Sequence, residues 1–212
     1  MKHLNLLFLS TAALLSSCGG GSGYTAPEPV PPPPALAPQV TLTVSNGAGV
    51  SGNIVVTLTP TQTPITVNNF LAYVASGHYV GTVFHRHERN FVLQGGGYVG
   101  PLVAGGTQPT ARPTTAPIAL EVGKGLSNVR YSVAMARTTE LNSATSQFFI
   151  NIVDNVTLDT QGGGYAVFGH VTSGTDVITA MVGAPCSAWA AFLGTACLPS
   201  PNITVTAAVK TR

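Results

Sequence analysis

A short stretch from Phe84 to Gly97 brings together a cation, an aromatic ring and an amide, and it ends in three glycines. The cation is the guanidinium of Arg86, the ring belongs to Phe91 and the amide to Gln94. As a strand, a turn and a second strand, the stretch places Arg86 on one strand and the other two residues on or beside the next. A fixed array of donors, an apolar ring and an amide then converge on one surface.

The surroundings of this stretch disfavour several other kinds of chemistry. Gly95–Gly97 is not a phosphate-binding loop, because no Lys-Ser/Thr pair follows it. Ser143 and Ser146 lack the context of a Ser-His-Asp hydrolase. His85 and His87 share one face of the first strand at a spacing that can bind a metal, but no complete ligand set is evident around them. We therefore interpret both as core or surface histidines and expect neither a metal nor a cofactor.

The composition indicates one globular domain with an unusually uncharged surface. The chain has 212 residues, of which 8% are charged, whereas about a quarter are charged in average globular proteins. The formal net charge is only +2. No basic block or aromatic-basic stripe indicates nucleic-acid binding.

The apolar pattern of the folded part is mostly that of β-strands. Apolar residues alternate over residues 40–44 and 54–58, and Asn46–Gly49 supplies turn residues between them, so we expect a hairpin. Further strands are expected at residues 82–84, 91–94, 118–120, 133–136, 147–152, 165–170 and 203–209. The segment 95–117, rich in Gly, Pro and Thr, is expected to be a long loop, either functional or mobile.

Two stretches instead show the period of an α-helix. The first begins at Thr66, which can cap it, has apolar residues at i, i+3, i+4 and i+7, and ends at Gly77. The second begins near Thr175 and ends at Gly183. Many strands with two helices favour a closed antiparallel barrel whose open ends are covered by helices.

Three segments resemble the cyclophilin family of peptidyl-prolyl isomerases. Residues 84–96 have the pattern F-H-R-x-x-x-x-F-x-x-Q-G-G, and Met135–Thr138 with Asn142–Asn151 resembles the M-A-[RN] and S-Q-F-F-I block. Gly164–Gly169 resembles the G-[YH]-x-V-F-G strand. The resemblance extends from Pro38 to the C-terminus. It implies a mainly β fold, a closed eight-stranded antiparallel barrel capped by two α-helices.

The resemblance also implies which residues form the active site. Arg86 is the catalytic group, which donates to the proline carbonyl and approaches the prolyl nitrogen. The residues expected to bind substrate are Phe91, Val92, Gln94, Ala136, Arg137, Thr138, Gln147, Phe149, Leu158 and Tyr165. Of the neighbours Phe148 and Phe149, which point to opposite faces of a strand, Phe148 is expected in the core.

The chain departs from the best-known eukaryotic pattern of the family at three positions. Val92 stands where methionine is common, Thr157 where that pattern has tryptophan, and Tyr165 where it has histidine. Bacterial cyclophilins often carry tyrosine at the last position. The threonine in place of tryptophan argues against tight cyclosporin binding more than it argues against catalysis.

The N-terminus has the pattern of a lipoprotein signal. Residues 1–17 contain an apolar stretch too short to span a bilayer, followed by Leu-Ser-Ser and Cys18. In signals of this kind the bond before the Cys is cut and the Cys is lipidated; the alternative is an ordinary secretory signal cut elsewhere. Residues 18–38 are a Gly- and Pro-rich linker, and residues 39–212 the isomerase domain.

Two cysteines remain once Cys18 is assigned to the lipid anchor. In an exported protein Cys186 and Cys197 can form a disulfide; the alternative is two buried free thiols. The segment between them contains Trp189 and Phe192.

Together these features predict a monomeric, lipid-anchored isomerase of the bacterial envelope. Its expected partners are proline-containing unfolded or exported polypeptides and, through Cys18, a membrane; nucleic acid is not expected. The domain would face the periplasm, and Gly19 in place of an Asp retention signal weakly favours the outer membrane. Two alternatives are a proline-segment-binding chaperone or adaptor with weak turnover, and a structural envelope lipoprotein.

Overall fold

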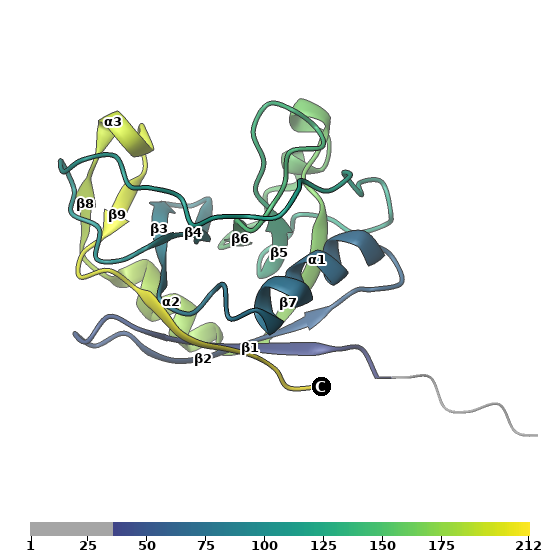
Figure 1. Cartoon of the computed structure of the whole chain (residues 1–212), viewed down its shortest axis with the longest axis horizontal. Coiled ribbons are helices and arrows are strands. Elements are labelled where there is room, and N and C mark those ends of the chain that lie inside the picture. The colour runs from purple at the N-terminus through teal and green to yellow at the C-terminus, as the bar shows by residue number, and fades with distance from the viewer. Residues whose placement is uncertain (1–35) are drawn as a thin grey trace, which may run out of the picture. The chain divides into compact units, whose positions relative to one another are not determined.

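The computed structural model describes residues 36–212, and the predicted signal segment, Cys18 and most of the linker lie outside the described residues (Figure 1). The strands are β1 (Gln39–Ser45), β2 (Ser51–Leu58), β3 (Thr82–Glu88), β4 (Val92–Val99), β5 (Ser132–Met135), β6 (Phe148–Asn151), β7 (Val167–Ser173), β8 (Cys186–Ala188), β9 (Cys197–Pro199) and β10 (Thr204–Lys210). The helices are α1 (Pro64–Ala75), α2 (Thr175–Gly183), α3 (Ala190–Leu193) and the 3₁₀ segments η1 (Val156–Asp159) and η2 (Gln161–Gly163).

Eight of these strands close into an antiparallel barrel. The order is β10-β1-β2-β7-β5-β6-β4-β3, and Thr204 of β10 pairs with Val83 of β3 to complete the ring. Closure removes the free edges of the sheet, which would otherwise expose unpaired backbone groups. The predicted fold, a mainly β closed eight-stranded barrel, is confirmed.

The predicted hairpin joins β1 to β2. The side-chain oxygen of Asn46 accepts the backbone N–H groups of Ala48 at 2.8 Å and Val50 at 2.9 Å. Gly47 and Gly49 adopt positive φ angles of 66° and 101°, which glycine tolerates best. These contacts set the register in which Val40 faces Val56 and Leu42 faces Ile54, with all four side chains buried in the barrel.

Both predicted helices exist, but the first begins two residues earlier than expected. α1 starts at Pro64, whose fixed φ suits the first helical position, and Thr63 precedes it. Thr66 is therefore not the cap: it lies inside the helix, and its backbone N–H and its hydroxyl both donate to the carboxylate of Glu121 at 2.8 Å. The buried carboxylate of Glu121 thus pairs with free N–H groups at the N-terminus of the helix and stabilises the positive end of its dipole.

Other boundaries also differ from expectation. β4 continues through Gly95–Gly97 to Val99, so the first part of the expected loop is a strand. A Cβ atom at Gly97 would lie 2.6 Å from the side chain of Gln147, so a larger residue there would displace that side chain. The expected strand at residues 118–120 is only an isolated bridge between Ile118 and Ala144.

The segment after α2 forms a small appendage that was not predicted. β8 and β9 make a hairpin that joins the barrel at β3, where Cys197 pairs with His87 (Figure 1, upper left). Cys186 and Cys197 form a disulfide across this hairpin, with their Cα atoms 5.6 Å apart. Beside α3, Trp189 and Leu198 are buried in a separate apolar cluster.

One large apolar cluster fills the barrel. Aromatic rings dominate its centre: the ring of Phe70 from α1 lies 5.6 Å from that of Phe148 and 4.9 Å from that of Phe168. Ile178 and Met181 of α2 belong to the same cluster, so both helices pack on the barrel interior. Within residues 36–212, no helix has the length and apolar character needed to cross a membrane.

Candidate active site

Strand register alone brings three of the predicted site residues into one row. Arg86 on β3 pairs with Gln94 on β4, which in turn pairs with Phe149 on β6. Residues directly opposite each other in neighbouring strands point to the same face of the sheet. The row lies on the outer face of the barrel, because the neighbouring Phe148 is fully buried in the interior, as predicted.

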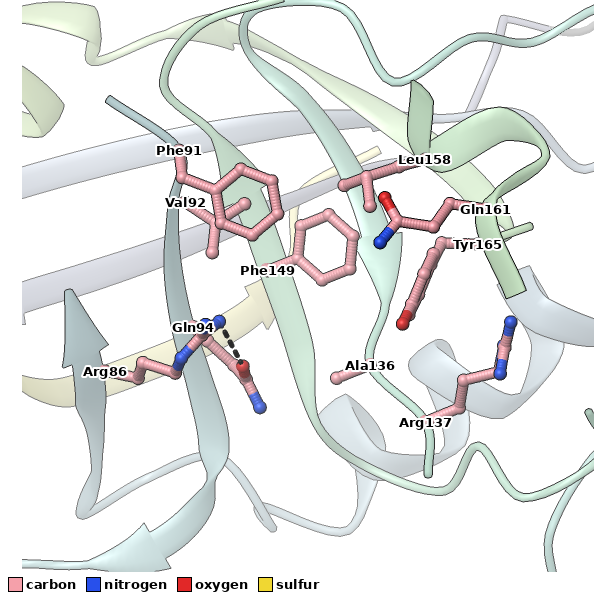
Figure 2. Close-up of a pocket in the computed structure, with 10 residues that line it drawn as sticks. All are labelled: Arg86, Phe91, Val92, Gln94, Ala136, Arg137, Phe149, Leu158, Gln161 and Tyr165. Carbon is pink, nitrogen blue, oxygen red and sulfur yellow. Dashed lines mark hydrogen bonds between the residues drawn. The ribbon is translucent and has the colours of Figure 1, made fainter. Parts of the chain in front are cut away.

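This row forms one side of a pocket of about 280 Å³ (Figure 2). Its lining residues are Arg86, Phe91, Val92, Gln94, Ala136, Arg137, Phe149, Leu158, Gln161 and Tyr165. All of these except Gln161 were predicted. The two remaining predicted residues, Thr138 and Gln147, line an adjoining pocket of about 240 Å³ together with Gln94. Thr157 is exposed on η1 and lines neither pocket.

The floor of the pocket is apolar and rigidly packed. Phe149, Leu158 and Val92 are each at most 5% exposed and belong to a second apolar cluster outside the barrel core. The ring of Tyr165 stands edge-on to that of Phe149 at 5.8 Å. Figure 2 shows the ring of Phe91 next to that of Phe149 in this floor, with the polar ends of Arg86 and Gln94 on one side of them. Such a surface can hold a small apolar ring next to a cation.

Two side-chain amides in series, Gln94 and then Gln147, orient the guanidinium of Arg86. Its Nη1 lies 3.4 Å from the Oε1 of Gln94, at the long end of hydrogen-bond distance. The Nε2 of Gln94 donates to the Oε1 of Gln147 at 2.9 Å. The ring of Phe91 lies 6.0 Å from the guanidinium carbon, at the outer limit of a cation–π contact. The cation is therefore oriented by neighbours while it remains partly open to solvent.

Glu88 is a part of this site that sequence reasoning missed. Its Oε2 forms an ion pair with the Nη2 of Arg86, and both side chains are 28% exposed. The signal was available, since residues two apart on a strand share a face and Glu88 follows Arg86 at that spacing. The other carboxylate oxygen lies 3.5 Å from the hydroxyl of Thr195, in the appendage next to the disulfide. The carboxylate of Glu88 thus accepts from one of the N–H donors of Arg86.

On the opposite side of the pocket, Arg137 fixes the segment that carries Leu158, Gln161 and Tyr165. Its guanidinium stacks on the ring of Tyr165 at 4.5 Å, and its Nε donates to the carbonyl oxygen of Gly164 at 3.0 Å. The Arg137 side chain therefore braces the pocket wall in addition to lining it.

Asp159 ties the same segment to residues just before β5. Its carboxylate accepts from Ser127 and from both the backbone and side-chain N–H groups of Asn128. Burial raises the pKa of Asp159, but the hydrogen bonds from Ser127 and Asn128 outweigh burial and lower it overall. The carboxylate is ionised at neutral pH, so this tie persists there.

The histidines of β3 lie outside the pocket, and of the two positions left open by the sequence, core or surface, both occupy the buried one. His85 is 3% exposed between the rings of Tyr98 and Phe192, and burial lowers its pKa to about 4. Burial, and then the charge of Arg89, lower the pKa of His87. Neither is charged at neutral pH, and among the pocket residues there is no base poised for proton transfer.

Comparison with known proteins identifies the family. Residues 40–205 match the family model described as cyclophilin type peptidyl-prolyl cis-trans isomerase/CLD. The chain belongs to the cyclophilin-type peptidyl-prolyl cis-trans isomerases. It is accordingly an enzyme that accelerates rotation about X-Pro peptide bonds.

Bacterial relatives agree with this assignment, and a solved structure shares the fold. Peptidyl-prolyl cis-trans isomerase cyp18 of Streptomyces antibioticus is 49% identical over 138 residues, which are 63% of this chain and 79% of that protein. Peptidyl-prolyl cis-trans isomerase B of Escherichia coli is 42% identical over 137 residues, 62% and 79% of the two chains. A cyclophilin type isomerase from Cryptosporidium parvum shares the fold, with a TM-score of 0.63 at 23% identity over 83% of this chain and 98% of that one.

Proposed function

We propose that this cyclophilin isomerises X-Pro bonds in exported or envelope proteins without covalent chemistry, by donation from Arg86 to the twisted prolyl amide. The observation that carries the proposal is the register row of Arg86, Gln94 and Phe149, which sets a cation beside an apolar floor. Because they surround this row, we assign the residues that line the two adjoining pockets to substrate binding, and Arg86 to catalysis.

The reaction needs little more than such a site. Amide resonance imposes a rotation barrier of about 18–20 kcal/mol, while the cis and trans forms of an X-Pro bond differ by only about 0.5–1 kcal/mol. At the top of the barrier the amide is no longer conjugated, and the lone pair of the prolyl nitrogen is localised. A donor that reaches this lone pair stabilises the twisted state and not the planar ground state, so it accelerates turnover.

The pocket suggests how the substrate lies. The proline ring rests on Phe149, Leu158 and Val92, and the proline carbonyl faces Arg86. Gln94 donates to the substrate backbone, and the backbone of Ala136–Thr138 accepts the residue before proline. A related cyclophilin from Cryptosporidium parvum, which has a TM-score of 0.62 to this chain, was crystallised in the presence of the dipeptide Ala-Pro.

We further propose that Cys18 anchors the domain to a membrane of the cell envelope. Acyl chains contribute about 0.8 kcal/mol per buried CH₂, so several chains on one cysteine hold a protein firmly. The linker at residues 18–38 would keep the active site clear of the lipid surface and facing unfolded exported chains in the periplasm. The absence of Asp after Cys18 favours the outer membrane.

Replacement of Arg86 tests the catalytic proposal. Arg86→Ala should lower kcat/KM by about 10²–10³, the usual loss when one preorganised donor is removed, while Tm stays near that of the wild type. Arg86→Lys should restore little, because an ammonium cannot present the same planar donors. A protease-coupled assay on a prolyl tetrapeptide measures the rate, and the exposed neighbour Arg89→Ala serves as the matched control. A folded Arg86→Ala protein with wild-type turnover would contradict the mechanism.

A further inference from the structure

The junction between β3 and the disulfide appendage holds a second cluster of chemically capable side chains, outside the active-site pocket. One ring nitrogen of His87 and the sulfur atoms of Cys186 and Cys197 all lie within 4.8 Å of one another. Across the β3–β9 pairing His87 faces Cys197, so their side chains share one face of the sheet. The disulfide then brings the sulfur of Cys186 to the same place.

His87 is unusual because it is buried without a hydrogen bond. The residue is 1% exposed, and neither ring nitrogen has a partner within residues 36–212. Buried polar atoms are normally paired, and each exception requires an explanation. The Sγ of Cys197 lies 3.5 Å from the backbone oxygen of His87 and makes no hydrogen bond to its ring.

The appendage is held in place by more than the disulfide. β8 and β9 pair over three residues each, and the buried side chains of Trp189, Leu193 and Leu198 form their own apolar cluster, against which Leu102 packs. Reduction of the disulfide thus leaves the two sulfurs near His87. Both cysteines are partly exposed, so a reductant and an ion can reach them.

We propose that, once the disulfide is reduced, Cys186, Cys197 and His87 bind one divalent metal ion that prefers sulfur and nitrogen ligands, with Zn²⁺ as the first candidate. Two thiolates and one imidazole are a recognised set of three protein ligands for Zn²⁺, and a water molecule would complete the tetrahedron. The two negative charges match the charge of the ion. Both ring nitrogens of His87 are buried without a hydrogen-bond partner, so either one is free to ligate an ion held by the two sulfurs.

The chemistry balances in two steps. A dithiol reductant exchanges with the Cys186–Cys197 disulfide, is itself oxidised to a disulfide, and leaves two protein thiols. Binding of the ion then releases one proton from each thiol, and two S–metal bonds and one N–metal bond form. Because the same sulfurs make either the disulfide or the metal bonds, the oxidised and metal-bound forms exclude each other.

Metal binding to reduced and oxidised protein tests this proposal. The full chain carries Cys18→Ser in every sample, so that only the pair supplies thiols. Zn²⁺ affinity is measured by competition with a chromophoric chelator, and Co²⁺ is added as a spectroscopic probe. The reduced protein should bind one ion per chain and show sulfur-to-cobalt charge-transfer and tetrahedral d–d bands, and the oxidised protein should show neither.

Two variants decide whether the three residues act as ligands. His87→Phe should fold, since the imidazole makes no hydrogen bond that would be lost, and it should weaken Zn²⁺ binding to the reduced protein by on the order of tenfold or more. A Cys186→Ala, Cys197→Ala double variant should abolish binding. His85→Phe, a buried histidine two residues away, is the control and should bind as the parent protein does.

Three outcomes would overturn the proposal: a reduced protein that binds no ion, equal binding by reduced and oxidised protein, or His87→Phe with unchanged affinity. Circular dichroism of each variant verifies the fold.

Discussion

The ion pair between Glu88 and Arg86 leads to a specific prediction about rate. The carboxylate holds one donor of the guanidinium that, in the proposed mechanism, must turn toward the substrate. Substrate therefore competes with Glu88 for the cation. Removing the negative charge should make the cation more available and raise kcat/KM.

The size of the effect follows from the exposure of the pair. Both side chains are 28% exposed, so the interaction resembles a surface ion pair, worth at most about 1 kcal/mol. A contribution of about 0.5–1 kcal/mol corresponds to roughly a two- to fivefold change in rate. Glu88→Gln should therefore raise kcat/KM by about two- to fivefold. The amide keeps an acceptor for Arg86, so the orientation of the cation is retained.

The assay is isomerisation of a prolyl tetrapeptide followed without a coupling protease, at low and at high salt. Salt screens exposed charges, so it should raise the rate of the wild type toward that of Glu88→Gln. Glu140→Gln changes an exposed acid outside the pocket and is the matched control. If Glu88→Gln lowers kcat/KM in a folded protein, the carboxylate positions the guanidinium and does not compete for it.

Three further predictions concern stability and processing. The pKa of buried His85 is about 4, below its ordinary 6.5, so the unfolded chain takes up a proton before the folded one and stability falls as pH drops from 6.5 toward 4. The free energy of unfolding measured in urea should therefore fall by about 2 kcal/mol more between pH 7 and 4.5 in the wild type than in His85→Phe. Non-reducing peptide mapping of exported protein should recover Cys186 and Cys197 cross-linked, and replacing both with Ala should cost roughly 2–3 kcal/mol for a loop with a sequence separation of 11; recovery of two free thiols would refute the pairing. Intact mass of membrane-extracted protein should show an N-terminal Cys18 with added acyl mass, and a soluble product cut elsewhere would contradict lipidation.

The barrel and most of the pocket could be predicted because their signals are local or carried by motifs. Alternation of apolar residues identified β1 and β2, and the turn residues at Asn46–Gly49 fixed their connection. The family resemblance placed Arg86 and Phe149 in one site, and strand register gives the physical reason for their proximity.

Several of the features that escaped prediction depend on contacts between distant parts of the chain, whereas Glu88 lies only two residues from Arg86 and was missed despite a local signal. The start of α1 was misplaced although Pro64 is a local signal for the first helical position, whereas the acceptor at its first turn, Glu121, is far away in sequence. The hairpin of β8 and β9 has strands of only three residues, too short to show a period. The proximity of His87 to Cys197 likewise arises only when β9 pairs with β3.

The glycine at position 97 has a consequence for how this enzyme tolerates sequence change. A methyl group there would meet the flexible amide end of Gln147, not the backbone, so the barrel itself need not move. Gln147, however, holds Gln94, and Gln94 contacts Arg86. In a library of random substitutions, changes at position 97 would therefore separate stability from activity. The fold would survive while the orientation of the Arg86 guanidinium changes. If Arg86 acts as proposed, a residue with no side chain thus affects the rate from outside the pocket.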